Sequence, residues 1–339
     1  MLTPQNKVFI AVIFLLLFFS SQTSFGQRTV IRGFVDAYAS SQNGKFGFGL
    51  GEQDLFITSE LNDRISFLGE SVFKFSLGSP TSFDVSIERV VLKYNFHGNH
   101  NLLLGKHHTP VNYWNYTYHH GRVFFPTIER PLLFEAEIIP LHTTGLSIQG
   151  QNLGESKFGY DFMIGNGLGA SDLGDNDKRK SITAGVRISP KEGLTLGGTY
   201  YNDVIAQGAK MHGGQINNWK VNQNLYSGSV AYFGKKFELL AEASITSNHT
   251  DTTGTKETFA GYFYAGYKIK EKFVPYIRMD NINSQSGEVY YHHPDRTSFV
   301  AGFRYEINYL SVVKLEFQHS NISMTGKADK VMAQFAIGF

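Results

Sequence analysis

Histidine is the residue type in this chain that most invites metal chemistry. Twelve histidines occur, and three adjacent pairs stand out, at His107-His108, His119-His120 and His292-His293. Neighbouring residues on a strand point to opposite faces, so a pair does not chelate one ion by itself. Zinc and copper sites need three or four converging ligands, and the spacing here matches no recognised ligand motif. We therefore predict no metal ion and no cofactor, with convergence of the histidines in residues 107–141 as the alternative.

Nucleophilic catalysis is the second chemistry to consider. His319-Ser320-Asn321 holds the residue types of a hydrolase. Because they are adjacent at a strand end, they do not form the hydrogen-bonded line that such a site requires. The chain has no Cys, which excludes thiolate nucleophiles, thiolate metal sites and disulfides. We predict that the protein is not an enzyme.

Charged residues at alternating positions are the better candidates for function. Taking the polar face of each strand-like segment, we expect these side chains to point into the interior of the fold. The basic members are Lys74, Arg89, Lys93, Lys106, Lys157, Arg187, Arg278, Arg304 and Lys314, and the acidic members are Glu70, Asp161, Glu238, Glu242, Asp280, Glu306 and Glu316. The two sets nearly balance, as does the whole chain with a formal charge of +2, so strong bulk ion steering and nucleic-acid binding are not expected.

A two-residue period indicates the elements that carry these charges. In the last segment Val331, Phe335 and Phe339 face one way, whereas Lys330 and Gln334 face the other. Apolar-out, polar-in alternation that ends on an aromatic ring is typical of outer-membrane barrels. The composition agrees, with 14% aromatic residues, 35 Gly and negative mean hydropathy. We find no long amphipathic helix after Gln27.

The first residues predict an export signal. Lys7 supplies a positive start, Val8 to Phe19 is an apolar run, and Ser24-Phe25-Gly26 offers small residues for cleavage. The run is shorter than the about 20 residues that a spanning helix needs. We expect residues 1–26 to be cleaved and residues 27–339 to form a single transmembrane domain.

Alternation and turn signals predict an all-β fold, a transmembrane antiparallel β-barrel of about 16 strands. Such a ring leaves an aqueous channel. Short connectors are expected at one end, at Asn62-Asp63, 97–100, 190–193, 234–236, 269–272 and 307–309. Long polar loops are expected at the other, at 166–180, 204–222, 248–257, 283–295 and 320–328. Glu88 and Arg89 are adjacent in a strand-like segment, and neighbouring side chains of a strand point to opposite faces. One of these two charges is therefore expected on the lipid side, at an interface or in a bulge.

One segment breaks this rhythm. Residues 107–141 are rich in aromatic residues and Pro, which argues against disorder. We predict that this third external loop folds into the lumen and constricts it. The residues expected to set the constriction and its selectivity are Lys74, Arg89, Lys93, Lys106, His119, His120, Arg122, Glu129, Arg130, Glu135 and Glu137.

Charges on this loop and on one wall suggest a transverse field. Lys74, Arg89, Lys93 and Lys106 come from three consecutive strands and are expected to form a basic patch. We hypothesise that the loop carboxylates face this patch across the neck, where a narrow low-dielectric passage focuses the field. The alternative is that each charge is paired locally or simply hydrated.

The same region resembles the Bacteroidota outer-membrane porins of the OmpL-like, beta-barrel porin-2 group. The similarity covers about Gly33 to Gly169. It is carried by Asn62 to Glu70, Leu102 to Lys106 leading into Thr109-Pro110, Tyr113-Trp114-Asn115, His119-His120-Gly121 and Arg130-Pro131. This resemblance implies passive diffusion of small hydrophilic solutes across the outer membrane.

Two classes of function follow from these observations. The first is a porin in the cell outer membrane, with lipid and small hydrophilic solutes as partners, no nucleic acid, and a homotrimer by analogy with wide porins. The second is a closed or plugged barrel that acts as an adhesin, a receptor or a secretion-complex scaffold through its external loops. Of these loops, 204–222 is long and contains Trp219, which favours the second reading, whereas no apolar interface patch is evident.

Overall fold

The computed structural model describes residues 28–76, 79, 81–118, 121–167, 175, 178–211 and 215–339. Over these residues the chain forms sixteen strands and the two short helices α2 (Tyr113–Thr117) and α3 (Leu132–Glu135). The strands are β1 (Arg28–Gln42), β2 (Lys45–Glu60), β3 (Ile65–Phe75), β4 (Phe83–His97), β5 (His100–His108), β6 (His142–Leu153), β7 (Phe158–Gly165), β8 (Ser181–Lys191), β9 (Leu194–Ile205), β10 (Val221–Phe233), β11 (Phe237–Thr250), β12 (Gly254–Tyr267), β13 (Phe273–Ser284), β14 (Arg296–Asn308), β15 (Ser311–Ile322) and β16 (Gly326–Gly338). The predicted export signal, residues 1–26, lies outside the described part.

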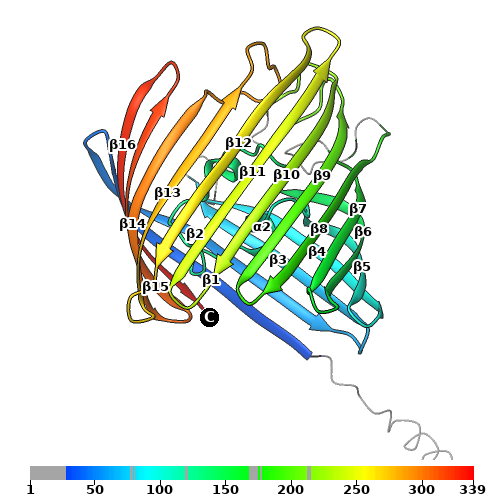
Figure 1. Ribbon diagram of the computed structural model, residues 1–339, viewed down its shortest axis with the longest axis horizontal. Coiled ribbons are helices and arrows are strands. Elements are labelled where there is room, and N and C mark those ends of the chain that lie inside the picture. The colour runs from blue at the N-terminus through cyan, green and yellow to red at the C-terminus, as the bar shows by residue number, and fades with distance from the viewer. Residues whose placement is uncertain are drawn as a thin grey trace, which may run out of the picture.

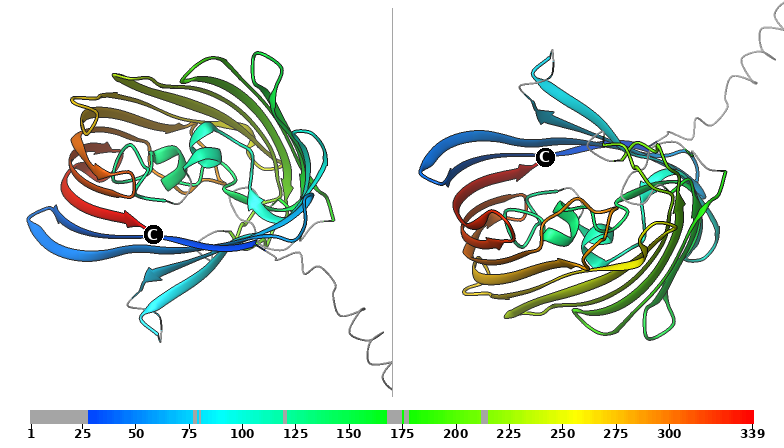
Figure 2. Two further views of the ribbon diagram at one scale, coloured as in Figure 1. Left: turned by 90° about the horizontal axis from the view of Figure 1, so that it is seen from below. Right: turned by 90° about the horizontal axis from the view of Figure 1, so that it is seen from above.

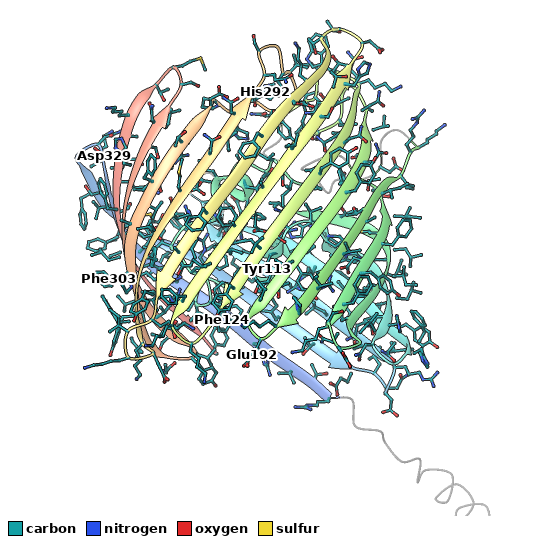
Figure 3. The ribbon with its side chains drawn as sticks, viewed as in Figure 1. Tyr113, Phe124, Glu192, His292, Phe303 and Asp329 are labelled. Carbon is teal, nitrogen blue, oxygen red and sulfur yellow. The ribbon has the colours of Figure 1, made fainter. Side chains whose placement is uncertain are left out.

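All strands join one antiparallel ring. Each strand pairs with its neighbours in sequence, and β1 pairs with both β2 and β16, which closes the barrel. The strands run obliquely around the ring (Figure 1). Glu192 lies at the end that carries the short turns, whereas His292 and Asp329 lie toward the opposite end (Figure 3). We call these the turn end and the loop end. The predicted all-β barrel of about 16 strands is confirmed.

The two faces of the wall differ as the alternation predicts. On β11, Phe237 and Ile245 are exposed on the outside, whereas Glu238 and Glu242 are buried on the inside. On β16, Val331 and Phe335 point outward. The outer surface is therefore an apolar band and the inner surface a polar one, as a barrel in lipid requires. Among the described residues no helix is long and apolar enough to span a membrane.

Two of the predicted long loops are mostly strand. The β11–β12 hairpin remains paired to Thr250 and Gly254, and the β15–β16 hairpin to Ile322 and Gly326. These stretches are polar on both faces, so they give no alternation signal. The first stretch, residues 248–257, is rich in Thr, which suits extended backbone, and in both hairpins the pairing continues beyond the apolar band.

Two irregular segments find a structural explanation. The pairing of β3 with β4 shifts after Glu70: Glu70 pairs with Arg89 and Ser71 pairs with Ile87, so Glu88 is the extra residue of a bulge. Both Glu88 and Arg89 thereby line the interior. On β12, which is aromatic on both faces, Phe263 points outward and Tyr262 is buried inside.

Candidate functional site

The segment between β5 and β6 builds the centre of the molecule. His107 and His108 still belong to β5, so this β5–β6 loop comprises residues 109–141. Figure 2 shows its two short helices within the ring of strands in both end views. Trp114, Phe125 and Phe134 of the loop are almost completely buried. They belong to one apolar cluster with inward side chains of the wall, among them Leu240, Tyr262, Tyr264 and Val300.

Three buried carboxylates of the wall hold backbone N–H groups of the loop. Glu242 on β11 accepts from the N–H groups of Tyr113 and Trp114. Asp280 on β13 accepts from Leu132 over 3.1 Å, and Glu316 on β15 accepts from Ile128 over 2.6 Å. These three carboxyl groups therefore fix the loop at points far apart in sequence.

Three cations of the same wall bind the loop's acceptors. Arg278 donates to the Thr127 hydroxyl over 2.6 Å and to the carbonyl of Glu129 over 2.7 Å. Lys314 donates to the carbonyl of Arg122 over 2.6 Å. Arg304 on β14 donates to the carbonyl of Pro126 over 3.3 Å.

The wall cations are also paired with wall carboxylates. Arg278 lies 2.8 Å from Asp280, and Arg304 lies 2.8 Å from Glu238. These residues are among the inward charges that the sequence predicts. The structure shows that Arg278, Asp280 and Arg304 also anchor the β5–β6 loop.

A cavity of about 360 Å³ remains on this side, bordered by Tyr118 and Phe124 of the loop and by Glu238 and Arg304 of the wall. Two further cavities lie along the other side of the ring. One cavity of about 310 Å³, the loop-end cavity, is bordered by the loop and by β2, β3, β4 and β6. Glu52 is at its centre, with carboxylate oxygens 3.0 Å from Lys74 Nζ, 3.1 Å from Arg122 and 3.8 Å from Arg130. Glu129, Glu135 and Glu137 line the same cavity.

Burial and neighbouring charges set the ionisation of the loop residues here. Burial disfavours the cationic form of Arg122, but Glu52 and Asp36 outweigh it and raise its pKa. Burial lowers the pKa of Arg130, because its charged neighbours compensate less. Burial, reinforced by Glu129, raises the pKa of Glu135.

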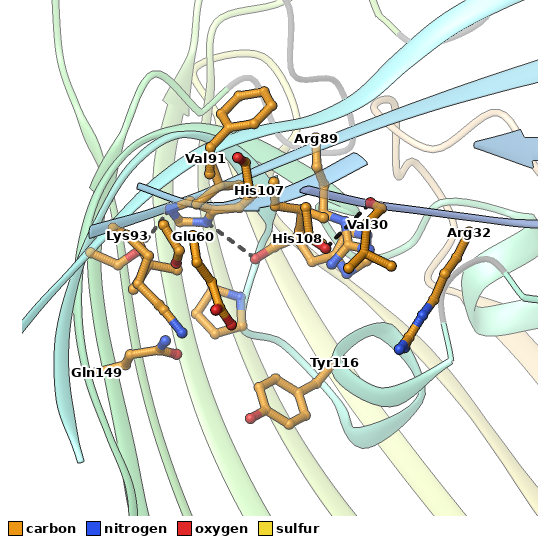
Figure 4. A pocket seen from close by; sticks show the side chains of 18 of the residues that line it. Val30, Arg32, Glu60, Arg89, Val91, Lys93, His107, His108, Tyr116 and Gln149 are labelled. Carbon is orange, nitrogen blue, oxygen red and sulfur yellow. Dashed lines mark hydrogen bonds between the residues drawn. The ribbon is translucent and has the colours of Figure 1, made fainter. Parts of the chain in front are cut away.

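A second cavity of about 500 Å³, the turn-end cavity, lies nearer the short turns (Figure 4). Arg32, Arg89 and Lys93 line it, together with Tyr116 and Gln149. Arg89 forms an ion pair with Glu70. Sequence reasoning assigned no role to Arg32, Tyr116 or Gln149, because β1 is only weakly alternating and Tyr116 lies in the irregular loop.

The expected basic patch is divided between these spaces. Lys74 lies in the loop-end cavity, whereas Arg89 and Lys93 lie in the turn-end cavity. Lys106 pairs with Val90, whose side chain is exposed on the outside, so the prediction that Lys106 faces the lumen is wrong. The assignment of alternate residues to the inner and outer faces fails here because the sequence does not show where this strand begins and ends. His119 and His120 lie outside the described residues.

The loop carboxylates have partners on the wall. Glu129 forms an ion pair with Lys330 of β16, and Glu135 lies 3.9 Å from Arg296 of β14. Sequence reasoning missed Glu52, which is the carboxylate that Lys74 contacts. The glycine-rich run preceding Glu52 in β2 hides its alternation, so only the pairing with β3 would have revealed its face.

The histidines and the predicted Ser–His pair are also placed. The rings of His108 and His142 lie 5.3 Å apart between centroids and are tilted by 55° to each other, and His142 lies 3.0 Å from Glu88. Within the described residues no group of three or more His, Cys, Asp or Glu side chains is arranged to hold a metal ion. His319 pairs with Asp329 over 2.6 Å, whereas Ser320 bonds to Ser298 inside the barrel. His319 and Ser320 therefore point to opposite faces.

A closed ring of sixteen antiparallel strands is the fold of outer-membrane porins. No protein-family model matches the chain, and no curated protein matches it in sequence. The fold is similar to that of the anion-selective porin from Comamonas acidovorans, with a TM-score of 0.68, 12% identity, and coverage of 92% of this chain and 100% of that one.

Other solved structures agree. The outer membrane channel DcaP of Acinetobacter baumannii has a TM-score of 0.67 and 13% identity, covering 94% of this chain and 99% of that one. OmpT of Vibrio cholerae, an outer membrane protein, in its trimer form has a TM-score of 0.65 and 11% identity, covering 92% of this chain and 99% of that one. At these identities the likeness establishes the fold.

Proposed function

We propose that the protein is a porin through which small hydrophilic solutes diffuse passively across the outer membrane, and that the β5–β6 loop narrows its water-filled lumen. The observation that carries this proposal is the unequal use of the inner wall. Most of the wall contacts of the loop backbone are with β11, β13, β14 and β15, whereas the two cavities richest in charged side chains border mainly β1 to β6. A passage bordered by ionised groups suits polar solutes.

The constriction proposed here combines loop and wall. Its lining residues are Lys74, Arg122, Glu129, Arg130, Glu135 and Glu137. Because Glu52 contacts three cations and the loop carboxylates face Lys330 and Arg296, charges of both signs border the passage. Selectivity then depends on size and on the local order of charges, with no catalytic step.

Several further properties form part of the proposal. Residues 1–26 act as a cleaved export signal, and the mature barrel resides in the outer membrane, with its apolar band in lipid. The motifs in residues 33–169 favour the Bacteroidota porin group named above. A homotrimer is proposed by analogy, since the similar barrel of Vibrio cholerae OmpT occurs in a trimer form.

Thiol labelling tests the channel directly, because the native chain has no Cys. The variant K74C introduces a thiol into the loop-end cavity, and K106C introduces one on the outer face as the matched control. A water-soluble anionic thiosulfonate should lower the single-channel conductance of K74C in planar bilayers and leave that of K106C unchanged. Proteoliposomes with the native chain should swell faster in small sugars than in large ones. Absence of both conductance and swelling would overturn the proposal and favour a scaffold or receptor.

A further inference from the structure

The turn-end cavity carries an unbalanced positive charge. Two of its charged residues are neutralised, because Arg89 pairs with Glu70, and Asp161 pairs with Arg187. The other cations of the lining are Arg28, Arg32 and Lys93, and Glu60 is the other carboxylate.

These three cations have no carboxylate within ion-pair distance in the part of the chain that the structure describes. In Figure 4 the side chains of Arg32 and Lys93 lie on opposite sides of the cavity, with Glu60 and Tyr116 between them and Gln149 below Lys93. An unpaired cation on each side is an arrangement that favours an anion between them.

The uncharged lining adds a second kind of recognition. Tyr116 borders the cavity with a partly exposed ring, and the Arg187 guanidinium lies over that ring at 4.4 Å from its centroid. Glutamine and tyrosine side chains can bond to hydroxyl groups, and an aromatic face can stack on the C–H face of a sugar. The volume of about 500 Å³ lies within the range of about 300–1,000 Å³ typical of small-molecule sites.

We infer that the turn-end cavity is a binding site for small hydroxylated carboxylates, such as hexuronates, with Arg32 and Lys93 as the anion-recognising residues. This inference rests on the proposed porin function and gives it a substrate class. Arg28 strengthens the positive potential, and Glu60 weakens it. The loop-end cavity differs, because its cations share Glu52 and face the carboxylates of the loop.

The test uses the full mature barrel in planar bilayers at low salt, where screening is weak. Sodium glucuronate or glucose is added to the side of the turn end, and the concentration that halves the channel current is measured. Glucose is the neutral control of similar size. We expect glucuronate to block at a lower concentration than glucose.

Two double variants locate the site. R32Q/K93Q removes the proposed recognition cations, and K191Q/K235Q removes two cations of the turn end that do not line the cavity. A unit charge about 6 Å away in water changes an affinity about threefold, so R32Q/K93Q should raise the half-blocking concentration of glucuronate about tenfold. K191Q/K235Q should leave it unchanged, and E60Q should lower it about threefold.

The outcomes separate the two proposals. A channel that conducts but is blocked equally by glucose and glucuronate, or equally in native and R32Q/K93Q forms, overturns the inference and leaves the porin function standing. A chain that does not conduct overturns the porin function. In that case calorimetric titration of the detergent-solubilised barrel with glucuronate decides the inference by itself, since a binding site predicts heat that R32Q/K93Q loses.

Discussion

Replacement of Arg278 by Met tests whether the wall holds the β5–β6 loop. Arg278 is buried, binds Thr127 and the carbonyl of Glu129, and lies 2.8 Å from Asp280. R278M removes three hydrogen bonds to the loop, to Thr127, Glu129 and Arg130, and leaves Asp280 without its neighbouring cation. Breaking a buried ion pair by removing one partner costs about 3–5 kcal/mol.

The cost should fall on loop docking, because Asp280 also accepts the N–H of Leu132. A loss of about 3 kcal/mol multiplies the undocked population more than about a hundredfold, since each 1.4 kcal/mol is a factor of ten. Limited trypsin digestion of the folded barrel reports this population through cleavage after Arg122, which lies in the loop and is followed by Val123. Open-channel current noise provides an independent readout.

The double variant R278M/D280N supplies the control. Asn keeps an oxygen that can accept from Leu132 but carries no charge, so it removes the unpaired carboxylate. We expect the double variant to recover about 1–3 kcal/mol of the free energy of loop docking, so trypsin should cleave it more slowly than R278M. If R278M is cleaved at the native rate and its current noise is unchanged, the wall does not hold the loop and the reasoning fails. If R278M does not fold, cleavage of the double variant against the native chain decides the question.

Three further changes have defined outcomes. E52Q removes the carboxylate shared by three cations, so permeability to anions relative to cations should rise about threefold by reversal potential. Burial and a neighbouring glutamate raise the pKa of Glu135. On acidification, cation permeability should therefore begin to fall at a higher pH than it would if this carboxylate had its ordinary pKa. E135Q should lack this pH-dependent fall in cation permeability. A permeability–pH profile of E135Q that matches the native one would contradict the prediction. G105A places a Cβ 1.9 Å from the Val90 carbonyl oxygen at a φ of +127°, so the folded fraction on heat-modifiability gels should drop. G228A has open space around its Cβ and should fold normally. Equal folded fractions of G105A and G228A would contradict the prediction that Gly105 cannot accept a side chain.

Sequence periodicity predicts the ring of strands because each strand is solvated by lipid on one side. On β11 and β16 the apolar residues recur at every second position, and the structure exposes them. The signal is local, so one strand suffices to show it. It fails at the loop ends of β12 and β15, where both faces are polar and hydrogen bonding alone extends the hairpin.

The candidate site was only partly predictable, because its charges depend on contacts between distant segments. Arg278 and Glu316 look like ordinary lumen charges in sequence, yet they bind a loop about 150 and 190 residues away. Lys106 is of a residue type expected in the lumen, but its pairing with Val90 places it on the outer face. Residue type alone does not distinguish a free charge from an anchor.

The anchoring pattern has a consequence for selectivity. A loop held at Tyr113, Ile128 and Leu132 by three separate strands does not move as a hinged lid without breaking several charge-assisted bonds at once. If the protein is the porin proposed above, the width of its passage is then a fixed property of the fold, and discrimination between solutes of one size must come from the charges that remain unneutralised. Among the described residues these concentrate on β1 to β4, at Arg28, Arg32, Lys93 and Glu60. Substitutions on this wall should therefore change which solutes pass, whereas substitutions on β11 to β15 should change how wide and how steady the channel is.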